Sequence, residues 1–370
     1  MRIAYMLTSL GIGGAERQVM ALAQRMSGQG HEVALIVLRA AVARQWQTPL
    51  TVVHLDMTKS PATLPGALIR GSRFLRSFQP DILHSHTFPA NMAARILRST
   101  GAVPRVLATI HNIYEGGRHR TLAYRLTDSL CAHTTAVSHA VADRCIATRS
   151  VPRHKTSVIT NGIDVHHFSS PSEQGARSRN FMHAQGDFIW LAAGRVVPAK
   201  DFDNLIAAFR LVRAASPDTQ LWIAGEFDAR HLRRITGELV DTEKFESEGI
   251  RWLGFCADMA ATIAPADAFV LSSAWEGMPL VVGEAMAMEK PVVATDVGVV
   301  RELIGQAGVL VPAKDPKALA GAMLRVMKLA RVERDAIGHA ARARICAHFD
   351  MNTKAEEWEA LYTNLLGHPR

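Results

Sequence analysis

The sequence has little cysteine and no long hydrophobic run. Four cysteines are scattered over 370 residues without a C-x-x-C pair, which predicts a reducing compartment and no structural zinc. No apolar run reaches the roughly 20 residues that a membrane-spanning helix needs. The apolar stretch at the N-terminus is too short for a signal peptide and is predicted to be a first strand. We therefore expect a cytoplasmic globular protein.

Positive charge is unevenly distributed along the chain. Up to Phe168 there are 19 Lys and Arg against 8 Asp and Glu, and after it 23 against 26. The whole excess of +8 therefore comes from the first half. A basic half indicates an anionic membrane surface, nucleic acid or a polyanionic substrate, with a solubilising surface as the alternative.

Short apolar runs alternate with helical patterns along both halves of the chain. Continuous apolar runs are typical of parallel strands that are buried on both faces. The alternation predicts an α/β protein with two Rossmann-like, doubly wound parallel sheets. The expected strands are 2–10, 31–39, 51–56, 81–86, 105–111, 133–137 and 156–160, then 188–193, 220–224, 250–253, 268–272, 291–295 and 308–311.

A polar segment at 169–186 interrupts this rhythm and is predicted to be an interdomain linker. It separates an N-terminal domain at 1–168 from a C-terminal domain at 187–350. The last segment, 351–370, contains an amphipathic helix that we expect to bridge the domains or to cap one core. Open α/β sheets bind ligands at the carboxyl ends of their strands, so a central cleft between the domains is expected.

Gly11, Gly13 and Gly14 lie in the turn between the first expected strand and helix. Glycines at such a turn allow backbone N–H groups to approach a phosphate. Glu16 replaces the last glycine of the G-x-G-x-x-G dinucleotide motif, and the second strand ends in Arg39 instead of an acid. These differences disfavour an NAD-dependent oxidoreductase. A purely structural tight turn is the alternative.

Arg195 and Lys200 lie in one loop after the first strand of the C-terminal domain. Two cations there could hold a diphosphate and neutralise the charge that grows as it leaves; solvated surface cations are the alternative. Asp201 and Asp203 form a D-x-D pattern that could hold a metal ion. We interpret Asp201 as a helix N-cap instead, with Asp203 favourable in the first turn.

The segment 275–287 is predicted to contain a turn and the start of a helix, and it carries two glutamates. Glu276 is expected on the loop, and Pro279 is a natural first-turn residue of the helix. Glu284 is expected inside the helix among apolar neighbours, where a carboxylate needs a partner such as a ligand hydroxyl. A surface position for Glu284 is the alternative.

Several histidines also invite a metal interpretation. His84 and His86 alternate on one expected strand, which we interpret as one side chain on each face. None of the histidines, His111 included, has a Cys or a carboxylate at a recognised ligand spacing. We therefore expect no metal ligation.

These segments together resemble the GT4-type retaining glycosyltransferases of the GT-B fold. Glu276 and Glu284 reproduce the family's E-x7-E motif, and the resemblance is colinear from residue 2 to about residue 348. Further matches are the run G-M-P-L-V-V-x-E-A-M-A, the loop G-R-x-x-x-x-K, the start G-G-A-E-R, Asn161-Gly162-Ile163-Asp164, and 298–303.

The resemblance implies a role for each matched residue. Arg195 and Lys200 would contact the diphosphate of a nucleotide-sugar donor, Glu276 the transferred sugar, and Glu284 the ribose hydroxyls. From the N-terminal, acceptor-side domain, His111 would face the donor sugar. Further donor contacts, mainly through backbone groups, are implied for Gly13, Gly14, Gly277, Met278, Pro279 and Leu280. No metal or other cofactor is implied.

The implied reaction moves a sugar from a nucleotide diphosphate sugar to an acceptor hydroxyl with retained configuration. A UDP-linked hexose or N-acetylhexosamine is the expected donor, and cell-surface polysaccharide or glycan assembly the expected setting. We favour same-face attack, with the leaving phosphate accepting the proton. A non-catalytic sugar-nucleotide-binding protein remains an alternative. Nucleic acid is not expected as a partner, because no aromatic platform accompanies the basic residues.

Two basic clusters in the first half indicate what its positive charge contacts. Arg70, Arg73 and Arg76 interleave with apolar residues, and the second cluster contains Arg118, Arg120 and Arg125. Members of the resembled family often act on lipid-linked saccharides. The clusters therefore predict peripheral contact with the anionic inner face of the cytoplasmic membrane, and a polyprenyl-linked saccharide acceptor.

Overall fold

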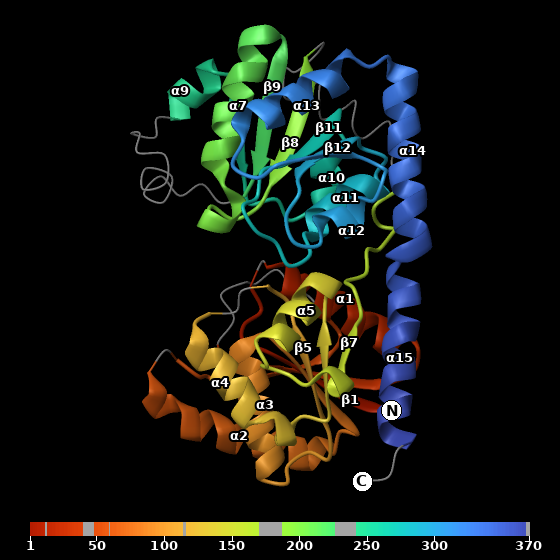
Figure 1. Ribbon diagram of the computed structural model, residues 1–370. Helices are drawn as coiled ribbons and strands as arrows, with labels where there is room; N and C mark the ends of the chain where they lie inside the picture. Colours follow the sequence, from red (N-terminus) through yellow and green to blue (C-terminus); the bar gives the residue numbers. More distant parts are fainter. Residues whose placement is uncertain are drawn as a thin grey trace. The chain divides into compact units, whose positions relative to one another are not determined.

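The chain folds into two compact units (Figure 1). The computed structural model describes residues 1–11, 13–39, 48–58, 60–113, 116–169, 187–225 and 242–367. The first unit comprises Met1–Gly162 and Met351–Arg370, and the second comprises Ile163–Asp350. Apart from Ser169, the expected linker at 169–186 lies outside the described residues.

The first unit contains a seven-stranded parallel sheet in the order β3-β2-β1-β4-β5-β6-β7. Its strands are β1 (Arg2–Leu7), β2 (Glu32–Val37), β3 (Thr51–His54), β4 (Ile82–His86), β5 (Val106–Ile110), β6 (His133–Ala136) and β7 (Thr156–Val158). Its helices are α1 (Gly14–Gly28), α2 (Leu64–Phe78), α3 (Phe88–Ser99), α4 (Arg118–Leu126), α5 (His139–Ala147) and α15 (Met351–Gly367), with short 3-10 turns at Pro61–Thr63, Asp128–Leu130 and Arg153–Lys155.

Strand β1 shows why the first sheet is covered on both faces. Successive side chains of a strand point to opposite faces. Ile3 and Tyr5 belong to one hydrophobic cluster, together with residues of α1 and α15. Ala4 and Met6 belong to another, together with residues of α2 and α3. An apolar run without polar interruptions is therefore what this position in the sheet requires.

The C-terminal helix α15 packs against the first unit. Trp358 and Tyr362 are buried in the same cluster as Tyr5, and α15 contacts α1. The amphipathic pattern near the C-terminus therefore covers one face of the first sheet.

The second unit contains a six-stranded parallel sheet in the order β10-β9-β8-β11-β12-β13. Its strands are β8 (Phe188–Ala193), β9 (Thr219–Ala224), β10 (Ile250–Gly254), β11 (Ala268–Leu271), β12 (Val292–Thr295) and β13 (Val309–Val311). Its helices are α7 (Phe202–Ala215), α9 (Thr242–Ser247), α10 (Met259–Ile263), α11 (Leu280–Ala287), α12 (Val300–Ile304), α13 (Pro316–Lys328) and α14 (Arg331–His348), with a 3-10 turn at Pro198–Lys200.

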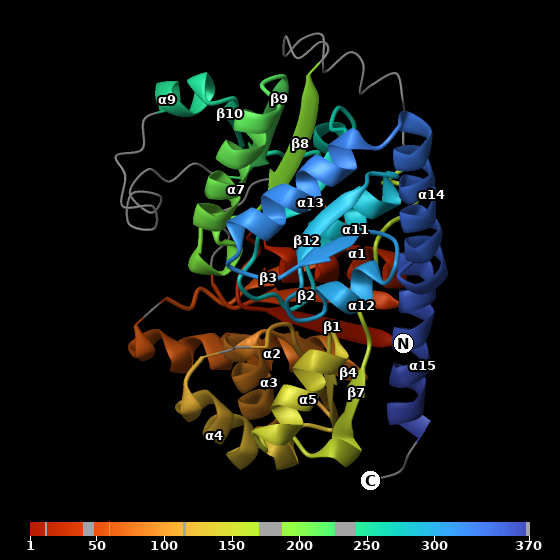
Figure 2. The ribbon, with the colours of Figure 1, turned by 45° about the horizontal axis from the view of Figure 1, so that its top comes forward.

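Helices cover both faces of the second sheet as well. Figure 2 shows α7 and α13 side by side along one face, where their apolar residues form a cluster with the strands around Trp190 and Phe209. On the other side α11 lies between the sheet and α14. Every one of the thirteen expected strands overlaps a strand of the structure, so the expected α/β class with two Rossmann-like sheets is confirmed.

The burial of Trp358 gives a test of how much α15 contributes to the first unit. We expect Trp358→Ala to lower the free energy of unfolding of that unit by about 3–5 kcal/mol, because it leaves a large apolar cavity. Glu356→Ala is the control, since Glu356 is exposed on the same helix. Urea denaturation of both variants measures the effect. Equal stabilities would show that the α15 contact contributes little.

Candidate active site

The loops that carry the predicted donor residues follow two neighbouring strands of the second sheet. Strands β8 and β11 are paired, and the strand order reverses between them, because β9 and β10 lie on one side and β12 and β13 on the other. Ligands of open α/β sheets bind at the carboxyl ends of strands at such a reversal. The loop after β8 carries Arg195 and Lys200, and the loop after β11 carries Glu276.

Lys200 and Glu276 form an ion pair at this edge of the sheet. Nζ of Lys200 donates to Oε1 of Glu276 at 2.6 Å, and their side chains are 19% and 12% exposed. The hydroxyl of Ser273 donates to the same oxygen, also at 2.6 Å. Two donors thus fix one carboxylate oxygen. No pattern in the sequence indicated that Ser273 would be one of them.

Further hydrogen bonds tie the two loops together. The backbone N–H of Ala274 donates to the carbonyl of Ala199 at 2.8 Å. The hydroxyl of Ser272 donates to the carbonyl of Lys200, also at 2.8 Å. Thr295, at the end of β12, donates through its hydroxyl to the carbonyl of Ser273 at 2.7 Å. The positions of Lys200 and Glu276 are therefore set by the backbone as well as by their own contact.

Two positions around Lys200 have unusual backbone geometry. Gly225 follows β9 with φ +157°, and a Cβ built there would lie 2.1 Å from the carbonyl oxygen of Gly194, so only glycine fits. Asp201 precedes α7 as predicted, but its backbone is left-handed at φ 47° and its side chain makes no capping hydrogen bond. Asp201 is therefore the N-cap residue of α7 that we expected, but it lacks the side-chain hydrogen bond of a typical N-cap. A capping residue normally has extended backbone.

The motif segment after β11 is largely buried. Gly277, Met278, Pro279 and Leu280 are all buried, and Glu284 is only 2% exposed on the second turn of α11. The surface alternative for Glu284 is therefore excluded. Pro279 occupies the N-cap position of α11, one residue before the first-turn position that we expected.

Arg195 differs from the other predicted residues of this loop. It is exposed and makes no hydrogen bond or ion pair with any residue that the structure describes. The structure therefore brings Lys200 and Glu276 together and leaves Arg195 at the surface of the same loop.

The first sheet has its own strand-order reversal, between β1 and β4. The glycine turn follows β1: Gly13 is the N-cap residue of α1 and Gly14 begins it. Thr8 after β1 and Thr87 after β4 share a hydrogen bond of 2.7 Å between their hydroxyls. The backbone N–H groups of the first turn of α1 are thus at the edge of the sheet where a ligand would bind.

Three histidines lie together on one face of the first sheet. His84 and His86 have ring centroids 4.0 Å apart, and His86 Nδ1 lies 3.0 Å from Nε2 of His111, which follows β5. Our interpretation that His84 and His86 point to opposite faces is wrong, because residues two apart on a strand share a face. His84 in turn contacts the Tyr362 hydroxyl of α15 and the Thr109 hydroxyl, each at 2.7 Å.

Burial keeps these histidines neutral. It lowers the pKa of His111 to about 4, and it lowers the pKa values of His84 and His86 well below the usual histidine value. Nε2 of His86 is buried without a hydrogen-bond partner among the described residues, and a buried N–H is rarely left unpaired. The proton of His86 is therefore assigned to Nδ1 and donated to His111, whose own proton is then on Nδ1.

In the part of the chain that the structure describes, no three His, Cys, Asp or Glu side chains are grouped so that they could hold a metal ion. The described helices also include none long and apolar enough to cross a membrane.

Comparison with protein families identifies both units. A model of Glycosyltransferase Family 4 matches residues 12–167, and a model of Glycosyl transferases group 1 matches residues 187–328. The chain belongs to the GT4-type glycosyltransferases. The family that the motifs indicated is therefore confirmed.

Similar proteins agree with this assignment. This GT4-type chain is 25% identical over 279 residues to UDP-Gal:alpha-D-GlcNAc-diphosphoundecaprenol alpha-1,3-galactosyltransferase of Escherichia coli, covering 70% of each chain. It is 26% identical over 367 residues to phosphatidyl-myo-inositol mannosyltransferase of Mycobacterium tuberculosis, covering 96% of this chain and 92% of that protein. The Anabaena protein HepE in complex with UDP and glucose is a structural neighbour, with TM-score 0.83, 20% identity, and coverage of 98% and 99%. The GT-B fold expected from the sequence is confirmed.

The buried histidines of this GT4-type chain predict acid sensitivity. Between pH 6.5 and about 4 the unfolded chain binds a proton at His111 that the folded chain does not, so stability falls as pH falls. One such group contributes a slope of about 1.4 kcal/mol per pH unit.

The prediction is checked by urea denaturation over this range. His111→Gln should reduce the slope by about that amount. The control variant, His154→Gln, replaces an exposed histidine of the same unit and should leave the slope unchanged. A wild-type stability that does not change over this pH range would contradict the neutral assignment.

Proposed function

We propose that this chain transfers a sugar from a UDP-sugar to a hydroxyl of a lipid-linked saccharide, with retained anomeric configuration. The observation that carries the proposal is the Lys200–Glu276 pair at the strand-order reversal of the second sheet. The names of the similar proteins support the substrate classes: the Escherichia coli relative acts on UDP-Gal and a diphosphoundecaprenol-linked sugar, and HepE binds UDP and glucose. The proposed setting is cell-surface polysaccharide or glycan assembly.

Lys200 and Arg195 are the proposed contacts of the donor diphosphate. A lysine has three N–H donors, so Lys200 can keep its bond to Glu276 and still donate to phosphate oxygens. Arg195 is exposed on the same loop, and its guanidinium can hold two oxygens at once. Together they would stabilise the negative charge that develops on the leaving diphosphate. No metal or other cofactor is part of the proposal.

The two glutamates are the proposed contacts of the two sugar rings of the donor. A carboxylate accepts hydrogen bonds only, and sugar hydroxyls can donate them. Glu276 Oε1 already accepts from Lys200 and Ser273, so we assign the second oxygen to the transferred sugar. The buried Glu284 is assigned to the ribose, and the segment from Gly277 to Leu280 to backbone contacts with the sugar and phosphate oxygens.

Retention requires either a carboxylate nucleophile or attack from the same face. Glu276 is held by Lys200 and Ser273 through one oxygen, which suits a positioning contact better than displacement of the diphosphate. We therefore propose same-face attack by the acceptor hydroxyl. Its proton passes to the leaving phosphate, while the bond from the anomeric carbon to the phosphate oxygen breaks.

The first unit would supply the remaining donor contacts and the acceptor. With its proton on Nδ1, neutral His111 can donate to a sugar hydroxyl without adding charge. Gly13 and Gly14 would place backbone N–H groups beside the phosphates.

Peripheral contact with an anionic inner membrane face is also part of the proposal, and the structure alters which helix we assign to it. On α2 the apolar residues Leu75, Phe74 and Phe78 pack on the core. Among its arginines, Arg70 donates to a backbone carbonyl of its own unit. Helix α2 exposes one large apolar residue, Ile69 at 53%, whereas α4 exposes two, Leu122 and Leu126, at 50% and 73%. We therefore assign α4 as the element that meets the lipid.

The role of Glu276 can be tested by substitution. We expect Glu276→Ala to lower transfer at least about 100-fold, because an interaction with the reacting sugar is lost, with the fold intact. Glu246→Ala removes an exposed carboxylate of the same unit and should leave the rate unchanged. UDP release from a panel of UDP-sugars, with polyprenyl-linked acceptors, measures the effect. Full activity of purified Glu276→Ala would reject its role.

Membrane contact can be tested by vesicle sedimentation. We expect co-sedimentation with phosphatidylglycerol vesicles, little with phosphatidylcholine, and a decrease at high salt. Leu126→Gln should weaken it. Val332→Gln is the matched control, because Val332 is 74% exposed in the second unit. Binding that does not depend on anionic lipid would remove this part of the proposal.

A further inference from the structure

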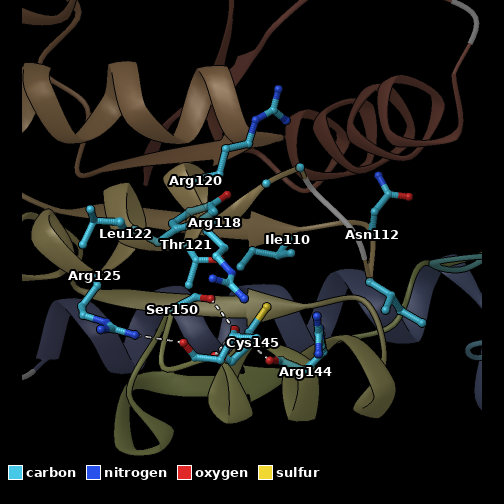
Figure 3. A pocket seen from close by; sticks show the side chains of 15 residues that line it. Ile110, Asn112, Arg118, Arg120, Thr121, Leu122, Arg125, Arg144, Cys145 and Ser150 are labelled. Carbon is cyan, nitrogen blue, oxygen red and sulfur yellow. Dashed lines mark hydrogen bonds between the residues drawn. The ribbon is translucent and has the colours of Figure 1, made fainter.

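A cavity of about 640 Å³ lies in the first unit, at the carboxyl end of β5 and between α4 and α5 (Figure 3). Ligand pockets typically have volumes of this size. Its wall includes Ile110 and Asn112, the two chain neighbours of His111. The cavity is therefore adjacent to the end of the strand to which we assigned a donor-sugar contact.

Among the lining residues that the structure describes, every charged side chain is positive. These fifteen residues include four arginines and no Asp or Glu. The arginines are Arg118, Arg120, Arg125 and Arg144. In addition, Gly117 in the wall is the N-cap residue of α4, so the positive end of that helix also faces this region. An anionic group is the ligand that this wall would attract.

Two of the four arginines already contact other described residues of the unit through their guanidinium groups, and the other two do not. Arg125 donates to the carbonyls of Thr148 and Arg149, each at 3.0 Å. Arg120 stacks on the Phe88 ring with its Cζ 4.7 Å from the ring centroid. Arg118 and Arg144 are exposed and make no side-chain hydrogen bond or ion pair with the residues that the structure describes. Figure 3 shows Arg118 extending from α4 toward Cys145 and Arg144 on the other side, whereas Arg120 points away.

Apolar surface adjoins this charge. Leu122 is part of the wall and is half exposed, and Leu126 follows one turn later on the same helix. Ile110 and Ile113 add apolar wall toward β5. A free inorganic anion would contact the arginines but not the adjoining apolar surface. A phosphate carried on an apolar chain would contact both.

We propose that this cavity binds the diphosphate of an isoprenoid-type lipid carrier, with Arg118 and Arg144 as its principal ligands. Guanidinium groups form paired hydrogen bonds with phosphate oxygens. The lipid chain would leave along Leu122 and Leu126. The assignment of this ligand as the acceptor rests on the proposed function. The binding itself does not.

Titration calorimetry with farnesyl diphosphate, below its micelle concentration, tests the proposal. The double variant Arg118→Gln/Arg144→Gln should bind at least about tenfold more weakly than wild type, because two charge-assisted contacts are lost. Arg153→Gln is the control, because Arg153 is an exposed arginine of the same unit outside the cavity. It should stay within about twofold, since a distant charge contributes little. A second variant, Thr121→Trp, narrows the cavity without removing charge and should also weaken binding.

Further binding measurements distinguish a lipid diphosphate from other ligands that carry a phosphate or an apolar chain. Inorganic pyrophosphate and farnesol should each bind more weakly than farnesyl diphosphate. Equally tight pyrophosphate binding would overturn the proposal, because it would describe a plain anion site. Equal affinity of wild type and the double variant for farnesyl diphosphate would overturn it as well. The proposal would also be overturned if the double variant lost binding to phosphatidylglycerol vesicles but kept binding to farnesyl diphosphate, because the ligand would then be bulk lipid.

The donor site provides the last control. Lys200→Met removes the lysine assigned to the donor diphosphate and should leave farnesyl diphosphate binding unchanged. If this variant, and not the double variant, loses the probe, the ligand sits in the second unit and the proposal fails. If the cavity binds the probe while no transfer is found with any UDP-sugar, the cavity proposal stands and the proposed function fails.

Discussion

The pairing of β8 with β11 is the constraint on which the candidate active site depends. Lys200 and Glu276 are 76 residues apart in sequence, and they meet because each follows one of these neighbouring parallel strands. Parallel strands end at the same edge of a sheet, and a reversal of strand order leaves space there for a ligand. The hydrogen bonds from Ala274, Ser272 and Thr295 then fix the loops. The backbone thus holds in place a cation and an anion to which we assign different parts of one proposed substrate.

The two units deal differently with polar groups at their ligand-binding edges. In the second unit, Lys200 and Glu276 form an ion pair and retain some exposure, so neither side chain is buried without a partner. In the first unit, His86 and His111 are buried and face each other instead of a carboxylate. A buried histidine without a counter-charge is more stable when neutral. One edge therefore presents charged side chains, and the other presents an uncharged hydrogen-bond donor.

The sequence predicted every strand in the described residues, the loops that carry the motifs, and the family. These features follow from local patterns: apolar runs give strands, and their order gives the class of sheet. What it did not predict depends on contacts across the sheet. Ser273 as a partner of Glu276 requires the orientation of a turn, and the left-handed Asp201 requires the path of the backbone. The shared face of His84 and His86 could have been read from the two-residue period of a strand. Their contact with Tyr362 of α15 could not, because that helix is distant in sequence.

Particular arginines explain part of the uneven charge of the chain, in addition to the proposed contact with an anionic membrane face. Several arginines of the first unit are engaged by their own fold: Arg70 and Arg125 donate to backbone carbonyls, and Arg95 is fully buried against Tyr124. Such residues add to the net charge but have few guanidinium N–H donors left for a ligand. Arg118 and Arg144 keep theirs, at a cavity that has apolar surface beside it. That combination matches the phosphate-bearing lipid that we propose, whereas charge alone would attract any polyanion.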